Sequence, residues 1–418
     1  MKVSFKRLIT IWAYIIGLMI VSKISTVSAQ RTFFDKFINE YRSFRGGIFK
    51  FVGRSDTEAA YLWNVKRQKV QKSYSQTVSF PCNPNGPGAR SNVTPISAHT
   101  VRPGDIDIVG AIGDSLTAGN GAFATNILQV FIENKGVSWS IGGQGDWRKF
   151  LTLPNILKEF NKNLYGYSTQ DGFSIDKSAR FNVAEIGAMS RDIPYEARIL
   201  VKRMRSDQNV DVQRHWKLVT ILIGPNDFCS DFCYLPYPEK SVENHRRELI
   251  ETLRILRDNL PRTIVNLVTP PSMKVIYQLR GKPKECVSSN HFECPCIFGF
   301  KYGHLRQLYF NIITKWQAVT AEVPDLEEFT NKDDFAVINQ PFLRHVRFPH
   351  VSNGNHDFKY MSVDCFHLSQ KGYAIAANSL WNNMFEPYGN KSTNWKKEFT
   401  EFKCPTAEHP YIFTRKNS

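Results

Sequence analysis

A short apolar run that stops at a serine constrains the fold of this chain more than any other feature. Residues 106–112 have the composition of a strand buried on both faces of a sheet. Gly113 then permits a sharp turn, and Ser115 follows at the carboxyl end of the expected strand, where open α/β sheets bind ligands. Ser115 is therefore the first candidate nucleophile. Alone, such a turn is more often an ordinary strand-to-helix connection, so its meaning depends on partners elsewhere.

Further apolar runs predict four more strands with helical patterns between them. Ser241 and Ser369 each precede apolar residues at helical spacing and are predicted N-caps. This alternation predicts an α/β fold with a mainly parallel five-stranded sheet that helices cover on both faces. The additional strands are predicted at residues 181–186, 218–223, 263–268 and 335–338.

The first 29 residues have the layout of a cleaved secretory signal peptide. Basic residues precede an apolar run, and Val27-Ser28-Ala29 offers small side chains for cleavage. A signal anchor is the alternative, but the run is shorter than the roughly twenty residues that span a bilayer. Asn92 and Asn390 begin glycosylation acceptor motifs. These features predict a secreted, extracellular glycoprotein whose signal peptide is residues 1–29.

The rest of the chain divides into three predicted segments. Residues 30–100 form an irregular lead-in that is rich in turn-forming residues. Residues 101–388 hold the strands and helices and make up the predicted catalytic domain. Residues 389–418 form a C-terminal tail that we expect to be peripheral.

Eight cysteines, an even number, predict disulfides in an oxidising compartment. Their spacing lacks the paired Cys-x2-Cys pattern of a zinc site, so no metal site is predicted. Pairing within each of the two close cysteine groups is geometrically easy, but the sequence leaves the connectivity open. The disulfide candidates in these groups and near them are Cys229, Cys233, Cys286, Cys294 and Cys296.

The chain is basic, with a formal charge of +16, of which +12 remains once the signal segment is set aside. Lysines and arginines are scattered rather than gathered into one arm, so no nucleic-acid partner is predicted. A solvated basic surface is the simplest interpretation. Transient attraction to anionic membrane surfaces is the alternative that we keep.

Three later motifs supply partners for Ser115. Gly187 follows the predicted strand at 181–186 and presents a backbone N–H with no side chain in the way. Asn226 follows the next predicted strand and offers amide donors at the same sheet edge. Asp364 lies three residues before His367, within reach of its ring. Each motif alone is usually an ordinary turn, but their order along an alternating sheet favours a shared site.

Acyl transfer requires this set of groups. A serine hydroxyl needs a base, the base needs an orienting acid, and the developing oxyanion needs preorganised donors. We predict Ser115, His367 and Asp364 as the triad. The N–H groups of Ser115 and Gly187 and the amide of Asn226 are the predicted oxyanion hole.

At these residues the chain resembles the GDSL, or SGNH, hydrolase family, whose name is an acronym of the Ser, Gly, Asn and His found here. Residues 113–122, 138–143, 152–157, 182–185 and 222–229 are most similar to its animal phospholipase B subgroup. The resemblance implies a three-layer α/β/α, flavodoxin-like fold. Pro225 stands where the family often has Gly, which is expected to stiffen the turn before Asn226.

The resemblance also implies an activity. It implies hydrolysis of fatty-acyl esters in phospholipids and lysophospholipids, of phospholipase B, phospholipase A or lysophospholipase type, without metal or other cofactor. A carbohydrate acetylesterase and a general lipase are the enzymatic alternatives, and a non-catalytic secreted lipid-binding protein is the third. No residue is assigned to substrate binding.

Overall fold

Four parallel strands form the central sheet of the computed structural model, which describes residues 40, 43–44, 46–47, 50–51 and 53–418. The predicted signal peptide, residues 1–29, lies outside the described residues. Neighbouring strands in the sheet follow the order of the chain, β1-β2-β3-β4. Their bounds are Ile106–Gly113 for β1, Trp216–Leu222 for β2, Thr263–Val268 for β3 and Phe335–Gln340 for β4.

The predicted fifth strand, residues 181–186, is wrong: in the described part of the chain the sheet has four strands. Asn182 forms only an isolated bridge with Ala111 of β1, and Tyr165 forms another with Ile108. Two separate segments thus share the outer edge of β1, and neither runs along it far enough to make a ladder. Gly166, at φ +100°, turns the chain away from that edge between them.

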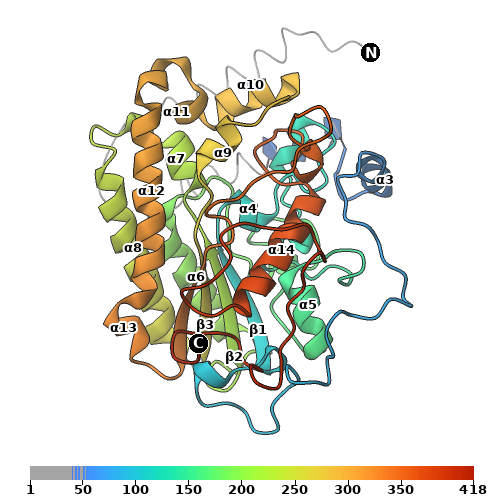
Figure 1. Cartoon of the computed structure of the whole chain (residues 1–418), viewed down its shortest axis with the longest axis vertical. Helices are drawn as coiled ribbons and strands as arrows, with labels where there is room; N and C mark the ends of the chain where they lie inside the picture. The colour runs from blue at the N-terminus through green and yellow to red at the C-terminus, as the bar shows by residue number, and fades with distance from the viewer. Residues whose placement is uncertain (1–39, 41–42, 45, 48–49, 52) are drawn as a thin grey trace. The chain divides into compact units, whose positions relative to one another are not determined.

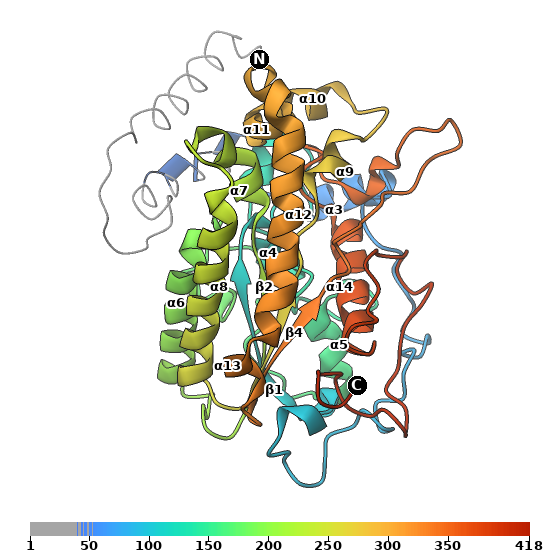
Figure 2. The ribbon, with the colours of Figure 1, turned by 60° about the vertical axis from the view of Figure 1, so that its left-hand side comes forward.

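Helices cover both faces of the sheet (Figure 1), as the sequence predicts. Helices α6 (Ile193–Ser206) and α8 (Lys240–Asn259) lie on one face, with α12 (Arg306–Glu322) beside α8. Helices α5 (Leu153–Phe160) and α14 (Gln370–Met384) lie on the other, as a second view shows (Figure 2).

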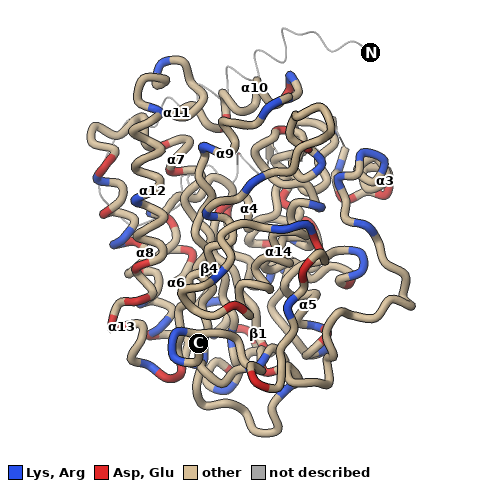
Figure 3. The backbone as a smooth tube through the Cα atoms, in the orientation of Figure 1, with Lys and Arg blue, Asp and Glu red and all other residues tan. Residues whose placement is uncertain are grey.

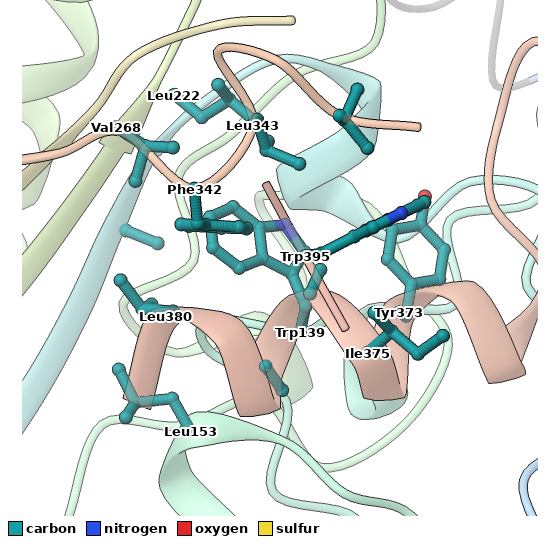
Figure 4. Close-up of a cluster of buried hydrophobic side chains, with 14 of the residues drawn as sticks. Trp139, Leu153, Leu222, Val268, Phe342, Leu343, Tyr373, Ile375, Leu380 and Trp395 are labelled. Atoms are coloured by element: carbon teal, nitrogen blue, oxygen red, sulfur yellow. The ribbon is translucent and has the colours of Figure 1, made fainter. Parts of the chain in front are cut away.

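The alternation of side chains along a strand explains the two packed layers. Ile108 and Ile112 of β1 pack in the same cluster as Leu200 of α6, whereas Val109 and Ala111 face the cluster of α5 and α14. The latter cluster is drawn in Figure 4. It includes Trp139, Leu153, Phe342, Tyr373 and Leu380.

One of the two predicted helix caps is confirmed. The Ser369 side chain accepts a hydrogen bond from the Gly372 N–H at the start of α14. Ser241 instead lies inside α8, which begins at Lys240, and its hydroxyl donates to the Pro238 carbonyl. The turn after Pro238 starts this helix earlier than the sequence pattern predicts.

Four disulfides join the eight cysteines, and every predicted disulfide cysteine is bonded. The two close groups pair with each other rather than within themselves. The reason is that α7 (Pro225–Ser230) packs against α11 (Pro295–Phe298), which brings one group alongside the other. The pairs are Cys82–Cys404, Cys229–Cys294, Cys233–Cys296 and Cys286–Cys365.

The lead-in and the tail pack onto the sheet domain and onto each other. Cys82 and Cys404 join the two segments. The backbone N–H of Ile412, a fully buried tail residue, donates to the Val101 carbonyl. The described residues belong to one compact unit, and the predicted segment boundaries remain a prediction. Within the same residues, no helix combines the length and apolar character needed to cross a bilayer.

Candidate active site

Ser115 lies where β1 turns into a short helix. Gly113 has φ +150°, and a Cβ there would lie 2.3 Å from the Leu222 carbonyl oxygen, so only glycine fits. Asp114 follows as the N-cap of α4 (Ser115–Ala118), and its side chain accepts from the Leu116 N–H. This turn makes Ser115 the first residue of α4, beyond the carboxyl end of the sheet.

His367 and Asp364 meet Ser115 from the loop before α14. The Ser115 Oγ lies 2.8 Å from His367 Nε2, and His367 Nδ1 lies 2.5 Å from Asp364 Oδ2. The other Asp364 oxygen accepts from the backbone N–H groups of Phe366 and His367. The structure thus brings the three predicted triad residues into one chain of hydrogen bonds.

The surroundings keep Asp364 ionised. Burial alone would raise the pKa of its carboxyl, but the charge of His367 and hydrogen bonds from its ring and from two backbone N–H groups lower that pKa below its ordinary value. Asp114 differs, because burial raises its pKa to about 7 despite the Leu116 hydrogen bond and the nearby His367. An ionised Asp364 is suited to orient His367 and to stabilise its protonated form.

Helix α10 (Lys284–Glu293) braces the loop that carries Asp364, a role that no sequence pattern indicated. Ser289 Oγ and Asn290 Nδ2 both donate to the Asp364 carbonyl, at 2.8 and 3.2 Å. The disulfide between Cys286 and Cys365 joins the same two segments. The only sequence signal was that Cys286 is a disulfide candidate.

Glu293, at the end of α10, adds a second carboxyl beside Asp364. Burial raises its pKa well above the ordinary value, and the neighbouring Asp364 raises it further. One potential ligand atom each from Glu293, Asp364 and His367 lies within 4.8 Å of the others. His367 Nδ1 and Asp364 Oδ2 are hydrogen-bonded to each other, and the raised pKa of Glu293 favours a neutral carboxyl beside this pair.

The two other predicted oxyanion groups lie in a turn and in the first turn of α7. Gly187 has φ +75° in a turn that the Ala188 N–H closes onto the Glu185 carbonyl, a position that favours glycine. The Asn226 amide donates to the Ala188 carbonyl at 2.9 Å, which joins α7 to the turn of Gly187. One Asn226 N–H is used in this bond, and the side chain has a second donor.

Pro225, where the family often has Gly, is the first residue of α7. Proline suits this position for two reasons. An N–H group at the first position of a helix would have no partner within the helix, and the fixed φ of proline matches the helical value. Gly224 before it has φ +131°. The sharp turn after β2 therefore depends on Gly224, and Pro225 holds the start of the helix that carries Asn226.

A second Ser–His contact, which no sequence pattern predicted, joins the segment after Gly187 to α8. Ser190 Oγ lies 2.7 Å from His245 Nδ1, and His245 Nε2 lies 3.0 Å from Thr320 Oγ1. The Ser190 N–H donates to the carboxylate of Asp227, next to Asn226. This network joins the Gly187 loop, α7, α8 and α12 through hydrogen bonds.

Other predicted residues lie away from this site. Asn92 and Asn390 are both exposed, as glycosylation requires, and their modification remains a prediction. A surface hollow between α6 and α8, lined by Arg198, Lys202 and Arg205, contains none of the site residues.

A serine at the end of the first strand of an α/β sheet, hydrogen-bonded to a His–Asp pair, is the arrangement of serine hydrolases. The model of the GDSL-like lipase/acylhydrolase family matches residues 109–380, and the chain belongs to this family. This match and the similar proteins confirm the family that the sequence motifs predict.

The similar proteins named phospholipase B1, membrane-associated, come from three mammals. The Homo sapiens protein is 37% identical over 78% of this chain and 22% of its own length. Those of Rattus norvegicus and Mus musculus are 35% and 36% identical, over 81% of this chain and 23% and 22% of their own lengths. The chain thus spans about a fifth of the length of these relatives. An extracellular lipase from Streptomyces rimosus aligns with a TM-score of 0.29 at 16% identity, over 64% of this chain and 94% of that one.

Proposed function

We propose that this protein is a secreted serine esterase that hydrolyses fatty-acyl esters of phospholipids and lysophospholipids. The observation that carries the proposal is the hydrogen-bonded chain from Ser115 Oγ through His367 to Asp364. Such a chain lets a hydroxyl transfer its proton as it attacks a carbonyl carbon.

In the proposed mechanism His367 Nε2 takes the Ser115 proton while Oγ bonds to the acyl carbon. The protonated His367 then gives that proton to the leaving alkoxide, and an acyl-enzyme remains. A water molecule, deprotonated by the same nitrogen, releases the fatty acid and restores Ser115. Asp364 holds the ring by its Nδ1 and stabilises the positive charge in both steps.

The proposed oxyanion hole is formed by three donors from three segments. They are the N–H groups of Ser115 and Gly187 and the side-chain amide of Asn226. The bond from Asn226 to the Ala188 carbonyl supports this role, because it fixes the amide before substrate arrives. Donors that are fixed in advance cost no reorganisation during the reaction.

The lipid substrate is supported by the names of the relatives, and secretion by the disulfides together with the predicted signal peptide. The basic net charge supports transient binding to anionic membrane surfaces. The proposal covers this chain alone, since the relatives are several times longer.

A phospholipid with different acyl chains at its two positions tests the proposed function. We expect wild-type protein to release fatty acid, identified by mass analysis, and to be labelled by a serine-directed phosphonate. The Ser115→Ala variant should fold normally and do neither. Release of acetate from acetylated glycans without phospholipid hydrolysis would favour the acetylesterase alternative. Folded wild-type protein that hydrolyses no ester and takes no label would contradict the proposal.

A further inference from the structure

Several exposed aromatic and apolar side chains gather on the segments beyond the carboxyl ends of β2 and β3. Four of them lie on or near α7, α9 (Met273–Tyr277), α10 and α11. We call them the aromatic face. Its members are Tyr234, Tyr277, Val287 and Phe300, which are 64%, 40%, 48% and 92% exposed.

Contacts between rings show that most of the aromatic face is continuous. Phe300 stacks on His291 with ring centroids 5.2 Å apart, and His291 contacts Phe298, which in turn contacts Tyr277. Val287 lies one turn before His291 on α10, so the two side chains are neighbours. Exposed apolar groups that lie together, rather than singly, mark an interaction surface.

Basic residues lie over several rings in and next to this face. Residues 271–306 contain six lysines and arginines and two glutamates, and one of these glutamates, Glu293, points inward toward Asp364. Lys282 lies over the ring of Phe298, and Lys301 lies over that of Tyr302, which contacts Tyr234. Figure 3 shows the Lys and Arg positions near α9, α10 and α11. The face therefore complements a surface that is both apolar and negatively charged.

The aromatic face is also attached to the proposed active site. Along α10, Cys286, Ser289 and Asn290 point inward, where they bond the loop of Asp364. Val287 and Lys284 of the same helix are exposed. A surface that contacts the outer side of α10 therefore lies one helix away from the triad loop.

We propose that the aromatic face docks on lipid bilayers that contain anionic lipids, with Phe300 inserted among the acyl chains and Lys284 and Lys301 against the headgroups. The proposal rests on the proposed function, because it gives the esterase access to esters in a membrane surface. Phenylalanine and tyrosine rings bordered by lysines have the composition of an interfacial surface, where apolar burial and charge attraction add. A bilayer is favoured over a protein partner because lysine and arginine side chains lie over rings of the face and of its neighbours, so basic and apolar groups alternate across it.

Vesicle binding tests this docking surface. All proteins carry Ser115→Ala, so that vesicles of phosphatidylcholine, with or without phosphatidylserine, stay intact during sedimentation. We expect tight binding to the anionic vesicles only. Phe300→Ser should weaken it roughly tenfold or more, from the loss of one buried ring. Lys284→Glu with Lys301→Glu should weaken it at least about 25-fold.

Matched controls lie at the opposite end of the sheet. Ile96 is 79% exposed, near the start of β4, and Lys332 is exposed in the same region. Ile96→Ser and Lys332→Glu should leave vesicle binding unchanged. In the wild-type Ser115 background, all of these substitutions should leave hydrolysis of a short soluble ester unchanged.

Several outcomes would overturn the docking proposal. One is that the Phe300→Ser and Lys284→Glu/Lys301→Glu variants bind vesicles as tightly as the control variants do. Another is that the Ser115→Ala protein without further substitutions binds no vesicles. A third is a dimer in light scattering that Phe300→Ser disperses, which would mean that a second copy covers the face. Vesicle binding through the face by a protein that hydrolyses no ester would contradict only the proposed function.

Discussion

The described part of the chain contains two buried Ser–His contacts, and they differ in a way that bears on which serine is suited to act as a nucleophile. Ser115 and His367 are joined at 2.8 Å, and Ser190 and His245 at 2.7 Å. The difference lies in the group on the far side of each ring. His367 faces the carboxylate of Asp364, whereas His245 faces the hydroxyl of Thr320.

This third group decides whether the ring can hold a proton. A carboxylate stabilises an imidazolium, but a hydroxyl does not. Burial lowers the pKa of His245 well below its ordinary value, and the charge of Arg246 lowers it further. His245 also stacks on Trp316, with centroids 4.0 Å apart, inside the helix layer. The inner contact is therefore structural, and a Ser–His distance alone does not identify an active site.

Replacing each histidine should give the largest contrast. We expect His367→Gln to lower kcat on a soluble ester by about 10⁴-fold or more, with little change in thermal unfolding. His245→Gln should retain kcat per folded molecule but lose about 1–3 kcal/mol of stability, because Ser190 and Thr320 lose a buried partner. Steady-state kinetics and thermal unfolding of both variants measure this. Equal loss of kcat in the two variants would contradict the assignment of a catalytic role to His367 and a structural role to His245.

Changing the third group tests the reason for that contrast. Asp364→Asn should lower kcat by roughly 10⁴-fold, because the amide favours the wrong tautomer of His367. Thr320→Val keeps the side-chain shape, so we expect a stability loss of about 1 kcal/mol and an unchanged kcat. If kcat of Asp364→Asn stays near the wild-type value, Asp364 does not orient the base.

Removing the Asn226 amide should have an intermediate effect. Asn226→Ala is expected to lower kcat by about 100- to 1000-fold while leaving KM nearly unchanged, because the amide acts in the transition state. Asn378 is a matched control, since its amide donates to the Glu401 carbonyl at 2.9 Å. Asn378→Ala should affect unfolding only. If Asn226 had a purely structural role, both variants would lose stability and keep kcat.

The smallest effect that we expect is a change in how stability depends on pH. It arises from Asp114 and Asp227, the carboxyl groups next to Ser115 and Ser190. Burial raises the pKa of Asp114 from 3.8 to about 7, and burial raises that of Asp227 well above its ordinary value. The folded state then binds protons more tightly than the unfolded chain at both carboxyls. Asp114 therefore lowers stability as pH rises from about 4 to 7, and Asp227 acts in the same direction. Asp114→Asn should reduce the fall in unfolding temperature between pH 5 and pH 8. An unchanged fall would show that Asp114 ionises as it does in the unfolded chain.

The features that sequence could predict are local. Gly113 and Ser115 could be found because a strand, a turn and a helix start follow within a few residues. Asp364 and His367 could be found because three residues separate them and one loop brings them into contact. The segment at 181–186 was wrongly predicted as a strand because its composition suits one. In the structure it shares the edge of β1 with Tyr165, and this arrangement depends on how distant parts of the chain pack around the sheet.

By itself, the sequence determined the α/β class, the family, the turn that carries Ser115 and the residues predicted as its partners. Only the tertiary structure decided which cysteines pair and which helix holds the Asp364 loop. It also decided that His245 is buried against Thr320 and Trp316. The physical reason is the separation along the chain between the residues that interact. Turns and caps arise from neighbouring residues, whereas a disulfide across 79 residues or a hydrogen bond across 75 depends on how whole helices pack.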